Sequence, residues 1–435
     1  MRIEIILLLF PIALAIRILA KTTGYRELIS LVSVLAIYML QPEIPIRYLS
    51  FWLPTMTIAI IIFSWILVTP KVDRKSKESV HFIHRLGLLI LAIGVTRYID
   101  QGDLNIFTRP PQIQIIAVGL ILMALIGLHL SNIPEGKASG FSSVALVGFL
   151  FLIFIILKNQ TLSLFAGQTL RQWAGQSPAL SSSLDLRWFG YSYIAFRLIH
   201  TLRDFQNKRL PAVSLQAYFN YVLFFPTLSA GPIDRLDRFI KDYDRVGENA
   251  DIGGDVLIGG KRLAFGLFKK FFLADALAVI ALNSTNSSQI TSTRWMWVLL
   301  YAYAFQIYFD FSGYSDIAIG LAKILGINVP ENFNRPYLKP NITQFWNSWH
   351  MTLTQWVRTY LFNPLTRAMR TSKFWNVPIM VIFIGQMATM VFIGLWHGIT
   401  INFLIWGLWH GLGLFIQNRW SNQMRGFHDR IVNKP

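Results

Sequence analysis

The chain of 435 residues contains no cysteine. It therefore forms no disulfide, no thiolate metal site and no acyl-cysteine intermediate. Charged residues are also scarce, at 14% of the chain, whereas hydrophobic residues make up 54%. This apolar content exceeds what one soluble core can bury, so the composition predicts an integral membrane protein.

Acidic residues are few compared with basic ones: 22 Asp and Glu stand against 40 Lys and Arg, for a formal net charge of +18. In a nucleic-acid-binding protein, basic residues gather on one soluble face. Here they lie in loops between hydrophobic runs, which is typical of the cytoplasmic loops of membrane proteins. We expect contacts with anionic membrane lipids or an anionic substrate, and no binding of nucleic acid.

Long hydrophobic runs are what the sequence does have. A membrane-spanning helix needs about 20 apolar residues, and runs of this order occur at 3–20, 28–40, 51–69, 85–99, 112–130, 141–157 and 188–203. The first run has the features of a signal peptide, with a possible cleavage site at residues 13–15. However, Glu4 interrupts the charged region, and apolar residues continue to Leu19, so we favour an uncleaved first span.

The basic loop at 69–85 determines the predicted topology. Because Lys and Arg are enriched in cytoplasmic loops, we place this loop in the cytoplasm; its basic residues are Lys71, Arg74, Lys75, Lys77 and Arg85. The N-terminus is then outside, and the loops at 41–50, 100–111 and 158–187 are external.

A polar stripe follows the run at 188–203. Tyr193, Arg197, His200 and Asp204 recur at the spacing of one helix face, so this face is expected to point into a helix bundle. One interpretation is a structural clasp between Arg197 and Asp204, with His200 hydrogen-bonded beside it. The other is a polar wall that binds the phosphates or amides of an acyl donor.

The segment 213–245 is apolar but broken by Pro226, Gly231 and Pro232. Proline removes a backbone donor and ends regular helix. Since basic residues flank both ends, the segment is predicted to enter the membrane and turn back. Irregular backbone at membrane depth requires protein or a cavity around it, so this turn is a candidate cavity wall.

A later span, near 295–325, contains two carboxylates within apolar sequence, Asp310 and Asp316. They are six residues apart and so do not face each other on a helix. A paired-carboxylate acid–base mechanism is therefore disfavoured. We expect these residues to hold neighbouring helices or to orient a catalytic histidine, although a direct role for either stays open.

Two histidines lie in unusually aromatic surroundings, His350 in FWNSWHMTLTQW and His397 in FIGLWHGIT. On a predicted helix at about 342–361, Asn347 and His350 share a stripe with Thr354 and Arg358, which is typical of a re-entrant or interfacial helix. A histidine anchored at the headgroup boundary is the alternative. Polar groups in a bilayer must be paired or face a cavity, so both histidines are candidate site residues.

The expected architecture is an all-α polytopic protein with about eleven spans and two re-entrant pieces. The last two spans are predicted at about 376–395 and 401–418, with the C-terminus in the cytoplasm. His350 then approaches from inside and His397 from nearer the outside, so the two could meet at a channel. We expect no metal, because no histidine spacing matches a ligand pair on one helix face.

Four stretches together resemble the membrane-bound O-acyltransferase superfamily: FFPTLSAGPIDRLDRF, QIYFDFSGYSDIAIGLAKILGINVPENFNRPYL, FWNSWHMTLTQWVRTYLFNPL and FIGLWHGIT. The resemblance covers about 185–415 and is closest to the bacterial branch that contains alginate O-acetyltransferase membrane subunits and the D-alanyl transfer protein DltB. Position by position, the family's near-invariant histidine falls on His397 and its second motif residue on His350. Trp396, beside His397, Asn347, Arg197 and the two aspartates are candidates for binding or orienting substrates.

The resemblance implies helices around a thinned centre, a thioester donor that arrives from the cytoplasm, and transfer to a hydroxyl on the far side. It divides the chain into N-terminal transmembrane helices at 1–184, a catalytic core at 185–420 and a basic cytoplasmic tail at 421–435. The implied location is the bacterial cytoplasmic membrane. No cofactor is bound; the co-substrate is acetyl-CoA or an acyl-phosphopantetheinyl carrier protein, and an extracytoplasmic SGNH/DltD-like acyltransferase is the expected partner.

Chemistry assigns His397 as the general base that takes the proton of the attacking hydroxyl. His350, with Asn347, would bind the thioester or donate to the developing oxyanion. Two other classes remain open. A secondary transporter or flippase would have broken helices as well, but it should show an internal repeat, and the histidine blocks have no counterpart in the first half. A non-catalytic scaffold of an acylation complex would tolerate replacement of both histidines.

Overall fold

The computed structural model describes residues 3–19, 24–99, 109–134, 137–246, 251–372 and 377–432. These residues are predominantly helical and contain no β-strand. Among them, five helices are long and apolar enough to cross a membrane. The structure therefore confirms the all-α membrane architecture, while the number of eleven spans stays a prediction.

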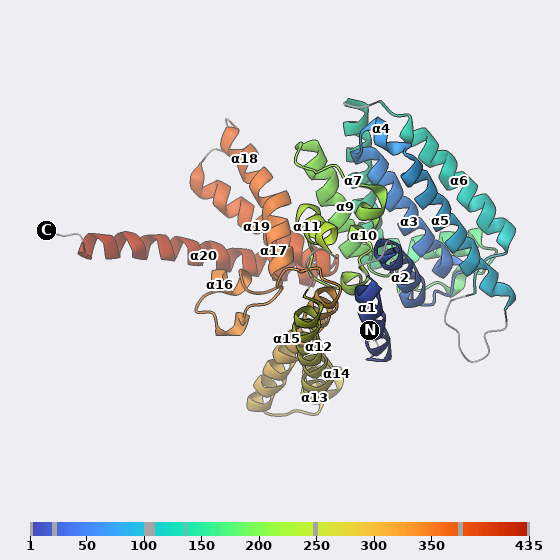
Figure 1. Ribbon diagram of the computed structural model, residues 1–435. Coiled ribbons are helices and arrows are strands. Elements are labelled where there is room, and N and C mark those ends of the chain that lie inside the picture. The colour runs from blue at the N-terminus through green and yellow to red at the C-terminus, as the bar shows by residue number, and fades with distance from the viewer. Residues whose placement is uncertain are drawn as a thin grey trace. The chain divides into compact units, whose positions relative to one another are not determined.

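Contacts divide the chain into two compact units (Figure 1). Unit 1 comprises residues 1–150 and 187–330, and unit 2 comprises 151–186 and 331–435. Residues 187–330 thus pack with the N-terminal helices, while the predicted division into functional parts at residue 184 stays a prediction.

The helices of unit 1 begin and end close to the predicted runs wherever the run is strongly apolar. They are α1 (Ile3–Ile18), α2 (Tyr25–Leu40), α3 (Leu49–Val68), α4 (Lys71–Arg74), α5 (Lys77–Val95), α6 (Ile113–Ser131), the first part of α7 (Lys137–Lys158), α9 (Tyr191–Gln206), α10 (Leu215–Val222), α11 (Leu236–Arg245), α12 (Ile252–Phe268), α13 (Asp275–Ile280), α14 (Ser284–Ser288) and α15 (Thr293–Ile324). The predicted external loop at 100–111 lies largely outside the described residues.

Helix α3 forms the centre of unit 1, since 78% of its apolar window is buried against 6% for α6. A helix that is apolar all round is stable either in a protein core or in lipid. The two helices illustrate these cases: α3 is enclosed by protein, whereas α6 leaves its apolar surface for the bilayer.

Helices α12 and α15 run side by side in unit 1 (Figure 1). Two pairs of glycines face each other along them, Gly259 with Gly320 and Gly266 with Gly313. A Cβ added at Gly266 would lie 2.7 Å from the carbonyl oxygen of Gly313. The absence of side chains lets the backbones approach, which is how helices commonly pack inside membranes.

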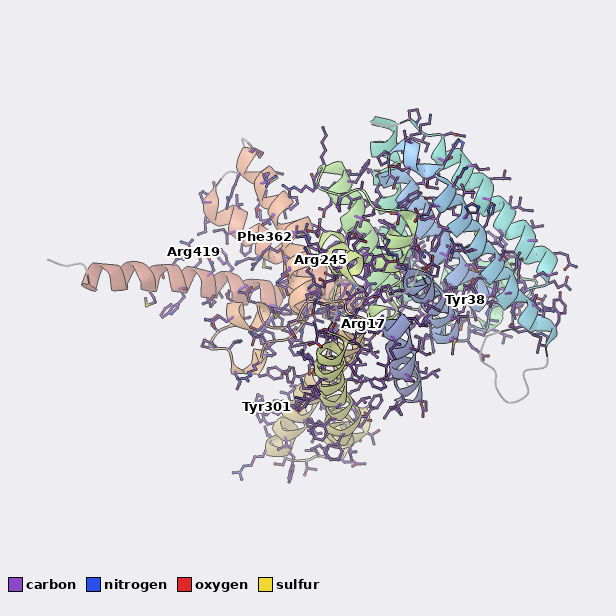
Figure 2. All side chains as sticks on the ribbon, in the orientation of Figure 1. Arg17, Tyr38, Arg245, Tyr301, Phe362 and Arg419 are labelled. Atoms are coloured by element: carbon purple, nitrogen blue, oxygen red, sulfur yellow. The ribbon has the colours of Figure 1, made fainter. Side chains whose placement is uncertain are left out.

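Unit 2 is organised around the antiparallel pair α19 (Pro378–His397) and α20 (Ile401–Val432). Its other helices are the end of α7, α8 (Gln160–Trp173), α16 (Ile342–Trp346), α17 (Met351–Val357) and α18 (Asn363–Thr371). Helix α20 continues well beyond the predicted span at 401–418, and Figure 2 shows Arg419 on this extension. The predicted tail therefore starts within a helix; its side chains from residue 425 onward lie outside the description.

One prediction about unit 2 is wrong, and one predicted loop contains a helix. The region 158–187, predicted as an external loop, contains α8, in which Ser163 and Arg171 are buried and Phe165 is exposed; its side of the membrane stays a prediction. The helix predicted at 342–361 is interrupted: α16 ends at Trp346, and α17 starts only after His350.

Candidate active site

His350 occupies the break between α16 and α17. Its backbone is left-handed, with φ 41° and ψ 52°, a conformation that costs energy for any residue other than glycine. Contacts with the segment before α16 hold it there: the backbone N of Met351 donates to the Asn332 carbonyl oxygen at 2.9 Å. Strain held by tertiary contacts is typical of functional positions.

The side chain of Asn332 orients the imidazole of His350. Nδ1 of His350 lies 3.0 Å from Oδ1 of Asn332, which also accepts from the hydroxyl of Thr352 at 2.9 Å. Because a carbonyl oxygen only accepts, Nδ1 carries the proton in this arrangement. In the neutral ring, Nε2 is then the acceptor nitrogen.

His350 is 3% exposed and lies outside the five apolar spans. Burial, and to a smaller extent the charge of nearby His397, lowers the pKa of His350 to about 3. The ring is therefore neutral near pH 7. A neutral ring with its proton on Nδ1 cannot donate from Nε2, so the expected donation to an oxyanion does not fit this geometry.

His397 is the last residue of α19, and its side chain is exposed in contrast to that of His350. The ring of Phe403 lies parallel to its imidazole at a centroid distance of 5.8 Å, and the ring of Trp406 lies edge-on at 5.9 Å. Gly394, one turn earlier, allows the tight hairpin, because a Cβ there would lie 2.3 Å from the Phe403 carbonyl oxygen. The glycines around His397 thus bring α19 and α20 together where the histidine leaves the helix.

Trp396 connects the two histidines. Its ring centroid lies 5.9 Å from that of His350 and 4.7 Å from that of His397, with edge-to-face geometry in both contacts. The indole is 8% exposed. The structure thus brings His350, Trp396 and His397 together in unit 2, one imidazole buried and the other open.

A second cluster next to His397 was missed by the sequence reasoning. The ring of Trp406 lies 4.5 Å from His410, and the ring of Trp346 lies 5.4 Å from His410 at 90°. The signal was present in the sequence, because the pentapeptide GLWHG occurs twice, at 394–398 and 407–411. Asn332 was missed as well, since nothing local indicates that it reaches a histidine eighteen residues away.

Asn347 is not beside His350. Its side chain is exposed, and its Oδ1 accepts from the Arg358 guanidinium at 3.1 Å. The interruption of the helix removes the shared face on which the prediction depended.

The two aspartates of α15 bind basic residues that follow or belong to α12. Asp316 accepts from Arg262 at 2.5 Å and from Lys269 at 2.6 Å, while Asp310 pairs with Lys270. They therefore hold neighbouring helices of unit 1, one of the two indirect roles expected for them.

Arg197 does not form the expected clasp with Asp204. Its guanidinium is 1% exposed and donates to the backbone oxygens of Val222 at 2.8 Å and Thr227 at 3.0 Å. Asp204 instead pairs with Arg235 at 3.5 Å. Pro226 has no backbone N–H to offer the Val222 carbonyl, and the chain leaves helical geometry after Thr227. The Arg197 guanidinium therefore supplies donors to both carbonyls, and its role in binding a donor molecule stays a prediction.

No group of three His, Asp or Glu side chains with the proximity of a metal site occurs in the part of the chain that the structure describes.

A sequence model of the MBOAT, membrane-bound O-acyltransferase family, matches residues 138–431, which include both histidines. The chain belongs to the membrane-bound O-acyltransferase family. The match extends further toward the N-terminus than the predicted core, since it begins within α7 and includes α8.

Two curated groups of bacterial family members are similar to this chain. It is 33% identical over 224 residues to a teichoic acid D-alanyltransferase of Bacillus subtilis, covering 51% of this chain and 56% of the relative. It is 37% identical over 229 residues to a probable alginate O-acetylase, AlgI, of Pseudomonas aeruginosa, which covers 52% of this chain and 42% of the relative. A third relative, a teichoic acid D-alanyltransferase of Lacticaseibacillus rhamnosus, is 31% identical over 264 residues, covering 58% and 65%. The chain thus matches about half the length of these relatives.

Proposed function

We propose that this protein is a multi-pass acyltransferase that moves a short acyl group from a cytoplasmic thioester to a hydroxyl outside the membrane. The observation that carries the proposal is the assembly of His350, Trp396 and His397 in one compact unit of a family member. The relatives are named for D-alanyl transfer to teichoic acid and for alginate O-acetylation, so acetyl and D-alanyl are the candidate groups. The hydroxyl belongs to a surface polysaccharide or to a partner protein that passes the group on.

His397 is the proposed general base. A hydroxyl is a poor nucleophile near pH 7, and an imidazole that takes its proton during attack contributes about 10² to 10⁴ in rate. The oxygen attacks the thioester carbonyl, the carbon–sulfur bond breaks, and the thiolate leaves with the donor carrier. The exposure of His397 supports this role, because an acceptor can reach an open ring.

His350 is proposed to bind the donor. Its Nε2 is the acceptor nitrogen when Nδ1 donates to Asn332, so it suits an amide N–H of a phosphopantetheinyl or CoA arm. Trp396 would form the wall between donor and acceptor. A channel that leads to the two rings from opposite sides belongs to the same proposal and would keep water from the thioester.

The proposed donor is acetyl-CoA or an acyl-phosphopantetheinyl carrier protein, and the proposed partner is an SGNH/DltD-like acyltransferase outside the cytoplasm. The orientation that fits these roles is N-terminus out and C-terminus in. Because the chain lacks cysteine, direct transfer needs the fewest steps; an acyl-serine intermediate is the alternative.

A complementation experiment tests the proposal. Alkali-released acyl esters from the envelope would be quantified by mass spectrometry in a deletion strain that expresses wild-type protein, His397→Ala or His81→Ala. We expect the His397→Ala strain to have no more acyl esters than the deletion strain, although the variant protein is as abundant in the membrane as the wild type. His81→Ala, in the predicted cytoplasmic loop, should restore them.

Wild-type ester levels in the His397→Ala strain would refute the role of His397. If His350→Ala also restored esters, the non-catalytic scaffold would be the better explanation. The mass of the ester lost from the deletion strain identifies the acyl group.

A further inference from the structure

Lys158 lies next to the open histidine of unit 2. It is the last residue of α7, and its carbonyl oxygen accepts a hydrogen bond at 3.3 Å from the backbone N of Ile399, two residues after His397. This backbone contact places Lys158 near His397, within the range of electrostatic interaction. Lys158, a cation, and His397, the proposed base, therefore lie at the C-terminal ends of two neighbouring helices, α7 and α19.

No carboxylate in the described part of the chain forms an ion pair with this cation. Within the described residues, the Lys158 ammonium makes no ion pair or side-chain hydrogen bond. In contrast, Lys269 and Lys270, which follow α12, and Lys323 of α15 are each paired with an aspartate. Unit 2 has only three acidic residues in its sequence, Asp185, Glu331 and Asp429. Asp185 is already engaged with Arg171 in a buried pair.

Lysines at the ends of spans commonly extend to lipid headgroups, and only 11% of the apolar window of α7 is buried. Lys158 differs from an ordinary anchor because its side chain is half-buried and its backbone is bonded to the loop after His397. The hydrogen bond holds the end of α7 beside that loop.

The neighbouring charge has a consequence for proton transfer. When His397 takes a proton, its positive charge is repelled by the charge of Lys158. An anionic group bound by Lys158 would offset this repulsion and would fix the acceptor hydroxyl near the ring. A neutral acceptor would do neither.

We propose that Lys158 binds a phosphate or carboxylate of the acyl acceptor, so that the site selects anionic hydroxyl compounds. This inference rests on the proposed function and specifies the charge of its acceptor. Loss of the anion contact should weaken acceptor binding roughly 10- to 100-fold, as expected for a hydrogen bond to a charged group.

The test measures binding without turnover, so that it does not depend on transfer activity. Full-length His397→Ala protein in phosphatidylcholine nanodiscs would be titrated with a fluorescent glycerol phosphate oligomer, an oligogalacturonate and a neutral maltooligosaccharide. We expect at least one anionic oligomer to bind more tightly than the neutral one. Adding Lys158→Gln should remove this preference, whereas Lys158→Arg should keep it.

Lys71→Gln is the matched control, because it removes the same charge from an exposed position in the basic loop, and it should leave binding unchanged. Equal binding of all three oligomers by the Lys158-containing protein would overturn the proposal, as would an equal loss with Lys71→Gln. If Lys158→Gln leaves oligomer binding intact but lowers the phosphatidylglycerol that co-purifies with the protein, the lysine binds a lipid headgroup, and the proposal is wrong. Loss of ester formation in His397→Ala cells is a separate result, and only that result bears on the base.

Discussion

The two copies of GLWHG have the same five residues and opposite surroundings. In the first copy, His397 ends α19 and Trp396 is 8% exposed; in the second, His410 lies within α20 and Trp409 is 74% exposed. Both histidines contact Trp406, at centroid distances of 5.9 Å and 4.5 Å. The first copy also contacts the buried His350 through Trp396.

The difference between the copies shows that the helix end, and not the motif, determines what the histidine can do. Within α20 the backbone continues, and His410 is packed against two indoles. At the end of α19 the chain turns at Gly398, so His397 is exposed and lies near the end of α7, where Ile399 is hydrogen-bonded to Lys158. A motif search alone would rank the two histidines equally.

The largest predicted difference is catalytic. With purified protein and a thioester donor, His397→Ala should lower the rate constant for transfer by about 10² to 10⁴, the range for loss of a general base. His410→Ala should lower it by less than tenfold. The measurement compares the steady-state transfer rates of the two variants at equal protein concentration. Equal losses of rate would show that the two copies of GLWHG act as a unit.

The tryptophans should differ in stability. Trp396→Ala empties a buried position and is expected to cost about 3–5 kcal/mol of unfolding free energy. Trp409→Ala changes an exposed position and should stay within about 0.5 kcal/mol. Thermal unfolding in detergent, followed by size exclusion, compares them; similar shifts would contradict the assigned burial.

Gly394 and Gly407, the first glycines of the two copies, should be equally intolerant of a side chain, because both lie where α19 and α20 are in contact. An added Cβ would lie 2.3 Å from the Phe403 oxygen at Gly394 and 2.7 Å from the Met390 oxygen at Gly407. Alanine at either position should cost about 1–3 kcal/mol through overpacking. Gly148→Ala is the control, since no atom lies within 4 Å of its added Cβ. A stable Gly394→Ala protein would argue against the close hairpin.

The smallest effect is expected at Trp406, which separates the two histidines. Trp406→Phe reduces one aromatic contact to each ring, worth about 0.5–1.5 kcal/mol, and should change the transfer rate by less than about tenfold. A larger loss, measured in the same assay, would mean that the second copy positions His397.

Features that depend on local sequence were predicted well. The runs at 51–69, 112–130 and 376–395 correspond to α3 (Leu49–Val68), α6 (Ile113–Ser131) and α19 (Pro378–His397), because a helix of about 20 apolar residues is defined by composition alone. The predicted topology also places the end of α7 and His397 on one side of the membrane, in agreement with the hydrogen bond between Ile399 and Lys158.

Features that depend on distant contacts were not predictable. The helical pattern continues through His350, and only the bonds to Asn332 explain the left-handed break. Helix α8 was hidden because it buries the polar residues Ser163 and Arg171 while Leu162 and Phe165 are exposed. The partners of Arg197 were also unforeseen, although Pro226 signalled that nearby carbonyls would need donors.

The bonds between Arg197 and the carbonyls at 222 and 227 constrain how the protein enters the bilayer during synthesis. A lone arginine at the centre of a membrane helix is unfavourable by about 2.5–3.5 kcal/mol on insertion scales, and its acceptors emerge from the ribosome some 25 to 30 residues later. As a span predicted from the sequence, helix α9 is therefore expected to wait at the translocon and to enter lipid together with the broken segment, as one unit of biogenesis.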